Sequence, residues 1–398
     1  MLPIHQSPSF SCKSVLGRFI AVCVFTALST TLSGCADLGY LMKSANGHLT
    51  LMRAAKPIDD WQSDPQTTPE LKARLSLARD IRRFAATDLA LPSNASYTRY
   101  ADLKRRAVVW NVVAAPTTSL TLKTWCFPVT GCIGYRGYFE EDEAKALAAE
   151  MKLQDLEVSI YGVPAYSTLG WLNWAGGDPL LNTFIHYPEA ELARLIFHEL
   201  AHQVAFAKDD TVFNESFATA VERIGGRQWL ASQAKSNSID VASDEFNANS
   251  ARRTQFRALT VATRRALNEI YRSDKPEQQM VAQKISAYQD FRAQYATLKA
   301  QWIAASNLNE QVAVDAAARQ FGGYDQWVAN ANNASFAAQA AYDELVPEFE
   351  NLYAQLARQP GPTWQRFYDA VKRLADMPQS ERRAALKNTA VAARKTTD

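Results

Sequence analysis

The chain has 398 residues, 47% of them hydrophobic, which is enough for a substantial core in one large or two smaller domains. Its 43 basic and 41 acidic residues leave a net charge of +2, so the charge gives no reason to expect a nucleic-acid partner. The composition is typical of a globular protein and excludes a disordered one.

The first 35 residues differ from the rest of the chain. Lys13 and Arg18 are the only basic residues before Lys43, and an uncharged apolar run follows them over residues 19–32. The run is shorter than the roughly 20 residues that a membrane-spanning helix needs, and small residues follow it. This order of features indicates a secretory signal.

The end of the run, LSGC at residues 32–35, resembles the lipobox of bacterial lipoproteins. The resemblance implies a signal peptide over 1–34, a diacylglyceryl group on Cys35, and a lipidated tether over 35–56 that holds the chain on a membrane. Ala36 follows the cysteine, as in enterobacterial lipoproteins of the outer membrane that face the periplasm. The alternatives are a signal peptide with a chance cysteine or an uncleaved anchor.

The apolar pattern predicts an α+β fold that is predominantly helical. A helix over 68–89 precedes a small sheet in the N-terminal half, with strands at 107–115, 119–127 and 156–162 and a helix near 141–151. From residue 189 the pattern is helical. Helices are expected over 189–207, from Asn214, and over 245–271, 277–304, 334–357 and 363–374, with breaks at Lys275-Pro276, Gly322-Gly323 and 360–362.

Cys126 and Cys132 remain once Cys12 and Cys23 are assigned to the signal and Cys35 to its lipid. A periplasmic location permits a disulfide between them, and the proline and glycine that separate them suit a tight loop. We predict a structural bridge, with two free thiols as the alternative. Five intervening residues match no zinc-ribbon spacing.

The string HELAH at residues 198–202 places two histidines four residues apart within an apolar helical pattern. Residues at this spacing share one helix face, so His198 and His202 can bind the same zinc ion. Glu199 lies beside them, where it can take the proton of a water molecule. The alternative is a buried helix with two hydrogen-bonded histidines.

A third ligand is expected from FNESFATAVE, residues 213–222, which supplies two carboxylates seven residues apart on one helix face. The Asn-Glu pair after HExxH resembles the gluzincin peptidases, the clan of thermolysin, and Asn214 suits a helix N-cap. We therefore predict Glu215 as the ligand, although the gap to Glu222 is closer to that of thermolysin. Glu222 and Thr219 then become candidates that orient a histidine, and His186 is an outside candidate for a ligand.

Several stretches together resemble the bacterial putative aminopeptidase family of predicted zinc-dependent lipoproteins. They are WCFPVTGC (125–132), YRGYF (135–139), AYSTLGW (165–171), DPLLNTFI (178–185), IFHELAHQ (196–203), FNESFATAVE and NNA (332–334). The resemblance covers nearly the whole mature chain, although GWLNWAGGDP is longer than the usual link. It implies a catalytic region over 57–398, divided into a sheet with the HExxH helix pair (57–230) and a helical part (231–398).

The resemblance implies an aminopeptidase that hydrolyses a peptide substrate with one zinc ion and Glu199 as the base. Candidates for stabilising the oxyanion are Tyr135, Tyr138, Tyr166 and Tyr342. Residues 165–171 are expected to form a cleft edge that pairs with an extended peptide. The alternatives are an endopeptidase, a hydrolase of peptidoglycan cross-links, or a noncatalytic envelope-binding lipoprotein.

Overall fold

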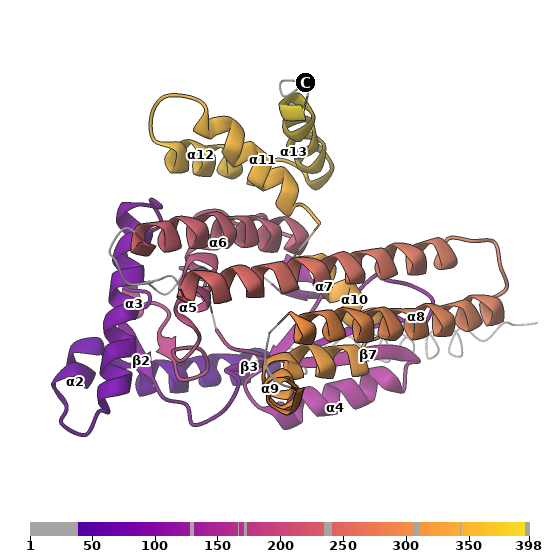
Figure 1. Cartoon of the computed structure of the whole chain (residues 1–398), viewed down its shortest axis with the longest axis horizontal. Coiled ribbons are helices and arrows are strands. Elements are labelled where there is room, and N and C mark those ends of the chain that lie inside the picture. Colours follow the sequence, from indigo (N-terminus) through magenta and orange to yellow (C-terminus); the bar gives the residue numbers. More distant parts are fainter. Residues whose placement is uncertain are drawn as a thin grey trace, which may run out of the picture. The chain divides into compact units, whose positions relative to one another are not determined.

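The computed structural model describes residues 39–127, 131–165, 167–170, 173–234, 241–305, 310–342 and 344–394 (Figure 1). The chain divides into two units, residues 1–53 and 54–398. In the first unit, residues 39–53 are helical. The predicted signal and Cys35 lie outside the described residues. No helix within the described ranges is both long and apolar enough to span a membrane.

The main sheet of the second unit has the strand order β6-β3-β7 and is antiparallel throughout. Its strands are β3 (Val109–Pro116), β6 (Arg136–Tyr138) and β7 (Leu156–Val163). Side chains alternate between the two faces of a strand. Val158 and Ile160 accordingly pack with Val112 on the face under helix α4 (Glu141–Lys152), and Tyr161 packs on the opposite face beside helix α10 (Asn333–Ala340).

Two smaller sheets accompany the main one. Strands β1 (Lys56–Pro57), β2 (Arg99–Ala101) and β8 (Leu180–Leu181) form the first, and a short 3-10 helix covers Asn173–Ala175. The second is the hairpin of β4 (Trp125–Phe127) and β5 (Gly131–Ile133).

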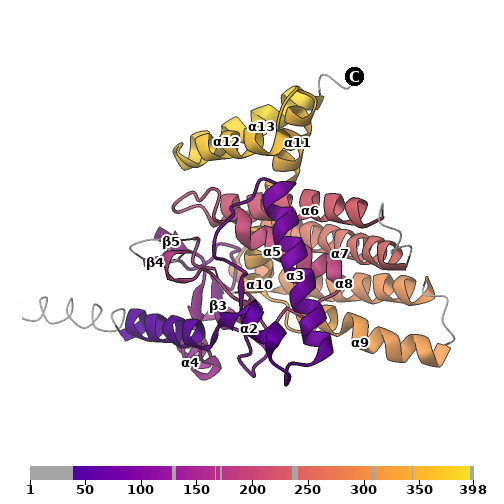
Figure 2. The same ribbon diagram turned by 90° about the vertical axis from the view of Figure 1, so that its left-hand side faces the viewer.

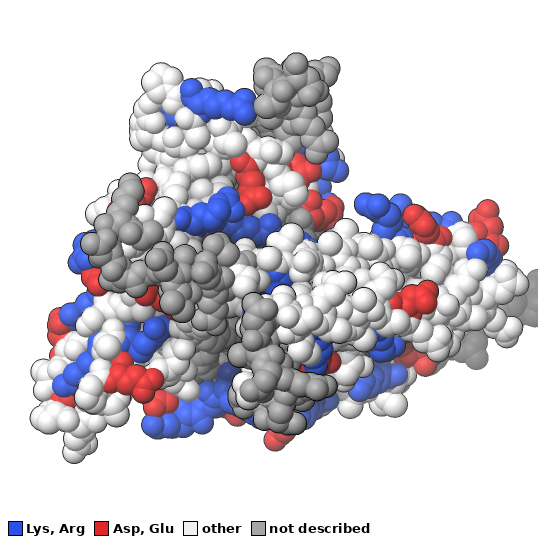
Figure 3. Space-filling view, in the orientation of Figure 1, with Lys and Arg blue, Asp and Glu red and all other residues white. Residues whose placement is uncertain are grey.

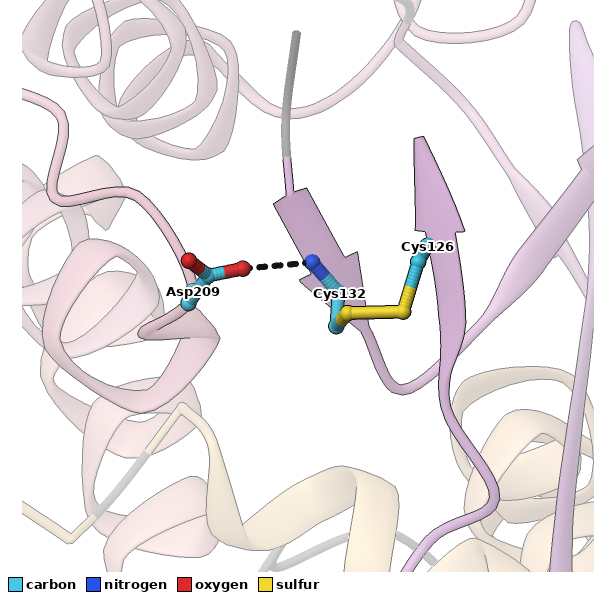
Figure 4. The surroundings of a disulfide bond; sticks show 3 residues. All are labelled: Cys126, Cys132 and Asp209. Atoms are coloured by element: carbon cyan, nitrogen blue, oxygen red, sulfur yellow. Dashed lines mark hydrogen bonds between the residues drawn. A yellow bond between two sulfur atoms is a disulfide. The ribbon is translucent and has the colours of Figure 1, made fainter. Parts of the chain in front are cut away.

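A disulfide joins Cys126 and Cys132, which face each other directly in this hairpin (Figure 4). The backbone N–H of Cys132 donates to Asp209 Oδ1 at 2.6 Å. Gly131 has φ +73°, and a Cβ there would lie only 2.0 Å from the same carboxylate oxygen. Glycine therefore lets the hairpin lie against the segment that contains Asp209.

Helices α2 (Ile58–Ser63) and α3 (Pro69–Thr87) precede the sheets. Thr68 caps α3 by accepting a hydrogen bond from the Leu71 N–H, which satisfies one of the free donors at the helix start. Helix α3 packs against α5 (Glu189–Ala201) and α6 (Thr211–Ala234), which also pack on each other (Figure 2).

The C-terminal half is helical, as expected. Its long helices α7 (Val241–Tyr271), α8 (Glu277–Ala304) and α9 (Glu310–Ala329) share an aromatic core with α10, formed around Phe256, Phe291, Trp327 and Phe336. Helices α11 (Val346–Ala357), α12 (Thr363–Ala375) and α13 (Gln379–Arg394) form a group beside α6 (Figures 1 and 2).

The predicted fold class is confirmed, but several predicted boundaries are wrong. Only residues 125–127 of the predicted strand 119–127 form a strand, and the predicted helix 189–207 ends at Ala201. The predicted helix 334–357 is two helices, α10 and α11. Gly322-Gly323 does not break a helix, because α9 continues through both residues. Side chains of both charge signs occur across the face shown in Figure 3.

Candidate active site

Helices α5 and α6 approach closely because α6 has two glycines at their contact. A Cβ on Gly225 would lie 3.0 Å from the Phe197 ring, and a Cβ on Gly226 would lie 2.8 Å from the Arg194 side chain. Larger residues at these positions would push the helices apart. The close contact brings the carboxylates of α6 to the histidines of α5.

The start of α6 differs from the prediction that Asn214 is its N-cap. The helix begins at Thr211, and the Asp210 side chain accepts from the Phe213 N–H at 3.2 Å. Asn214 lies in the first turn, and its amide bonds both the N–H and the C=O of Ala207. Asn214 therefore fixes the loop before α6, while the adjacent Glu215 points to the histidines.

His198, His202 and Glu215 bring three potential metal donors together. The Nε2 atoms of the two histidines are 3.2 Å apart, and Glu215 Oε2 lies 3.3 Å from the first and 3.6 Å from the second. Donors that bind one zinc ion tetrahedrally at ~2.05 Å are about 3.3 Å from each other. Two imidazoles and a carboxylate at these distances fit one zinc ion.

Glu222 contacts the other side of the His198 ring. Its Oε2 lies 3.0 Å from Nδ1 of His198, and its Oε1 accepts from Arg194 Nη2 at 2.6 Å. An Nδ1–H donated to a carboxylate leaves the Nε2 lone pair free for a metal. Glu222 therefore lies where it can orient the ring of His198, and Arg194 holds it there.

A family model described as "Putative aminopeptidase" matches residues 39–386. The chain belongs to this family. Membership supports a role as a peptidase. No curated protein and no solved structure matches the chain.

The donor cluster of this family member favours a positive charge. Although burial lowers it, the pKa of His198 is raised well above its ordinary value by hydrogen bonds and charge from Glu215 and Glu222. Burial also disfavours ionised Glu222, but Arg194 and His198 lower its pKa to about 2. A site that stabilises a proton between two carboxylates has the negative potential that a cation requires.

A pocket of about 700 Å³ opens beside these residues. His198 and Glu199 of α5 line it, together with Val163 and Pro164 at the end of β7. Residues of α7 and α9 form a further wall, among them Arg253 and Tyr324. Burial raises the pKa of Glu199, although charge on the two histidines opposes the shift. A buried carboxylate with a raised pKa, facing a pocket, suits proton transfer.

Three tyrosines lie near Glu215. Tyr342 lines the pocket, and its ring stacks on that of His198 with centroids 6.3 Å apart. The charge of Glu215 raises the pKa of Tyr342 well above its ordinary value, so its hydroxyl stays protonated and able to donate. Tyr135 and Tyr161 lie behind it, packed against the α10 face of the sheet.

Other predicted residues lie elsewhere. Tyr138 packs on the α4 face of the sheet, and His186 pairs at the surface with Glu70 at 3.6 Å. Tyr166 lies outside the described residues, and so does part of the stretch 165–171, in which no described residue belongs to a strand. Thr219 lines the pocket, but among the described residues its hydroxyl makes no hydrogen bond to either histidine.

A polar network behind the pocket is not evident from the sequence. Asp178 accepts from the Thr168 N–H at 3.0 Å, and Gln203, directly after His202, donates to both Asp178 and Ser96. Burial and the charge of Glu199 raise the pKa of Asp178 to about 6, against hydrogen bonds from Thr168 and Ser167. The network joins the end of α5 to the loop around residue 168. Thr168, Asp178 and Gln203 lie in three of the stretches that carry the family resemblance, but nothing in those stretches indicates that they meet.

Proposed function

We propose that the protein is a zinc-dependent peptide hydrolase of the aminopeptidase type, anchored in the cell envelope through lipid on Cys35. The observation that carries the catalytic proposal is the triangle of His198, His202 and Glu215 donor atoms beside a pocket that Glu199 lines. Family membership supports the peptidase role. The lipid anchor and the periplasmic location rest on the sequence alone.

His198, His202 and Glu215 would hold the ion and leave room for substrate on the pocket side. When bound, zinc would supply Lewis acidity to the scissile carbonyl and to a water molecule. Glu199 takes the proton from the attacking water at its carboxylate and delivers it to the leaving amine nitrogen.

The other residues orient these groups. Glu222 keeps the proton of His198 on Nδ1, so that Nε2 remains a donor to the ion, and Arg194 holds Glu222 in place. Among the predicted tyrosines we assign oxyanion stabilisation to Tyr342, because it lines the pocket beside His198 and keeps its proton.

The test compares the purified protein with its Glu199→Gln variant. Both are expected to contain one zinc ion per chain, because Glu199 is not a donor. The variant should lose roughly 10²-fold or more of its activity on aminoacyl reporters, the range expected for loss of a general base. Equal activity of the two proteins on aminoacyl reporters and on peptides with a blocked amino terminus would contradict the hydrolase proposal. Cleavage of the blocked peptides would contradict the aminopeptidase type alone.

A further inference from the structure

Strand β7 has an open edge. One edge pairs with β3 over its whole length, and the other pairs with no strand among the described residues. A second cavity, of about 950 Å³, lies along this strand. Every residue from Leu156 to Gly162 lines it. Since neighbouring residues point to opposite faces of a sheet, a cavity that all of them line must follow the edge of the strand.

Backbone groups at this edge point into the cavity. Ala114 of β3 lies directly opposite Val158 of β7. The C=O of Ala114 accepts from the Lys123 N–H, on the side of β3 away from β7. Ala114 and Val158 are therefore a pair without backbone hydrogen bonds to each other. The backbone N–H and C=O of Val158 therefore point away from β3, and the C=O accepts from Asn332 Nδ2 at 2.9 Å. Because the direction of the backbone groups alternates along a strand, those of Ile160 and Gly162 also point away from β3. No hydrogen bond to these groups is found among the described residues.

The cavity leads to the candidate active site. Val163 and Pro164, which directly follow the residues along the groove, line the pocket that contains His198 and Glu199. The C=O of Val158 is already bonded to Asn332, so the free part of the edge is residues 159–163, about 16 Å long at ~3.3 Å per residue. A chain paired with this edge would continue directly to Glu199.

The opposite wall of the groove explains an unusual feature of α9. Gly322 and Gly323 lie inside this helix, where each glycine costs ~1 kcal/mol relative to alanine. A Cβ on either would meet no atom within 4 Å, so packing does not require glycine there. Gly323 lines the groove. Its missing side chain keeps the groove open across from β7.

We propose that the open edge of β7 binds an extended segment of the polypeptide substrate as an added β-strand, away from the hydrolysed bond. The inference rests on the proposed peptide hydrolysis, and it narrows the substrate class to chains with about five residues beyond the site, rather than dipeptides. Trp110 and Trp327 line the groove and would pack against the side chains of the bound strand.

The test measures binding separately from hydrolysis. Fluorescence anisotropy with the Glu199→Gln protein would compare a labelled Thr/Val-rich peptide of about ten residues with a tripeptide from its end. The longer peptide is expected to bind at least roughly tenfold more tightly, because it gains several backbone hydrogen bonds. Alternate backbone amides of the bound peptide would point toward β7. Methylation of these amide nitrogens should remove the gain in affinity, and methylation of the intervening ones should not.

Gly323→Trp and Gly322→Trp form a matched pair, since both add an indole where a Cβ meets no atom within 4 Å. Only Gly323→Trp fills the groove, so only it should weaken binding of the long peptide, with tripeptide binding and thermal stability unchanged. Equal affinities of the two peptides, or equal effects of the two variants, would overturn the proposal. A dimer of the chain that Gly323→Trp dissociates would also overturn it.

The outcomes separate the two proposals. Length-dependent binding without hydrolysis of any peptide would reject the hydrolase proposal and support the binding edge. Hydrolysis of short reporters without length-dependent binding would leave the hydrolase proposal intact and reject the binding edge.

Discussion

His198 is contacted on both nitrogens of its ring, by Glu215 at Nε2 and Glu222 at Nδ1. The seven-residue spacing of the two glutamates is ~10.5 Å along a helix, which lets α6 reach both sides of one imidazole. The sequence predicted these three residues, because spacing on a helix fixes which side chains share a face. It did not predict Arg194, because a buried arginine is recognised only once its partner on another helix is known.

The two glutamates are expected to differ in their effect on metal content. Glu215→Ala removes a donor, so the protein should purify without stoichiometric zinc. Glu222→Ala removes only an orienting partner, so zinc affinity should fall by roughly 10- to 100-fold while binding remains measurable. Zinc titration with a competing chelator checks both, with His186→Ala as a control that retains full affinity. Loss of zinc in Glu222→Ala but not in Glu215→Ala would reverse the assignment.

Asp178 makes stability depend on pH. Its pKa of about 6 in the folded protein exceeds the ordinary value of 3.8, so the folded state holds the proton more tightly. Stability from this group is therefore complete below about pH 4 and is lost as pH rises through 6, by roughly 3 kcal/mol at most. As the pH rises from 4 to 7, the melting temperature of the wild type should decrease relative to that of Asp178→Asn. The exposed Asp142→Asn serves as the control, and an opposite slope would contradict the prediction.

At the scale of elements, periodicity predicted α8 correctly, because its apolar positions repeat over many turns. It failed for α13, whose early residues are mostly polar and basic, and whose position depends on Arg382 and Arg383 binding the buried Asp210. It also treated the Gly322-Gly323 pair as a break, and it gave no role to Gly225-Gly226. In the structure Gly225 and Gly226 permit a close helix contact, and Gly323 borders an open groove. Local sequence cannot distinguish these roles.

Matched alanine substitutions in α6 and α9 should have opposite effects on stability. Gly225→Ala places a Cβ 2.7 Å from Leu89 and 3.0 Å from Phe197, so it should destabilise the fold by about 1–3 kcal/mol through overpacking. Gly322→Ala meets no neighbour and should stabilise by up to ~1 kcal/mol through helix propensity. Urea unfolding measures both, and a stabilising Gly225→Ala would show that the helices separate at little cost.

For the molecule as a whole, residues 54–398 form one compact unit in which the helical part is bonded to the sheet. Lys284 of α8 donates to the Thr117 C=O and pairs with Glu157 of β7. Asn333 of α10 donates to the same carbonyl and receives hydrogen bonds from Tyr271 and Tyr288. The sequence offered no sign of this network, because its bonds between helix and sheet join residues that are 127 to 216 positions apart.

Lys284→Ala is expected to destabilise the whole unit, because it leaves the mostly buried Glu157 without its cation. The cost should be about 3–5 kcal/mol, as for other broken buried pairs. Lys299→Ala removes a more exposed pair with Asp325 and should cost less than ~1 kcal/mol. Denaturant unfolding, followed by both far-ultraviolet circular dichroism and tryptophan fluorescence, would measure the loss of stability in each variant. Similar losses in the two variants would mean that the Lys284 pair does not join the sheet to the helices.

The Cys126–Cys132 hairpin has a practical consequence for metal measurements. If the protein is produced in a reducing cytosol, two thiols will face each other with Cα atoms 3.9 Å apart. Thiolates are strong zinc ligands, so reduced protein can take up ions that have nothing to do with the histidines. Metal-to-protein ratios are therefore meaningful only for preparations in which the absence of free thiols has been verified with a thiol reagent.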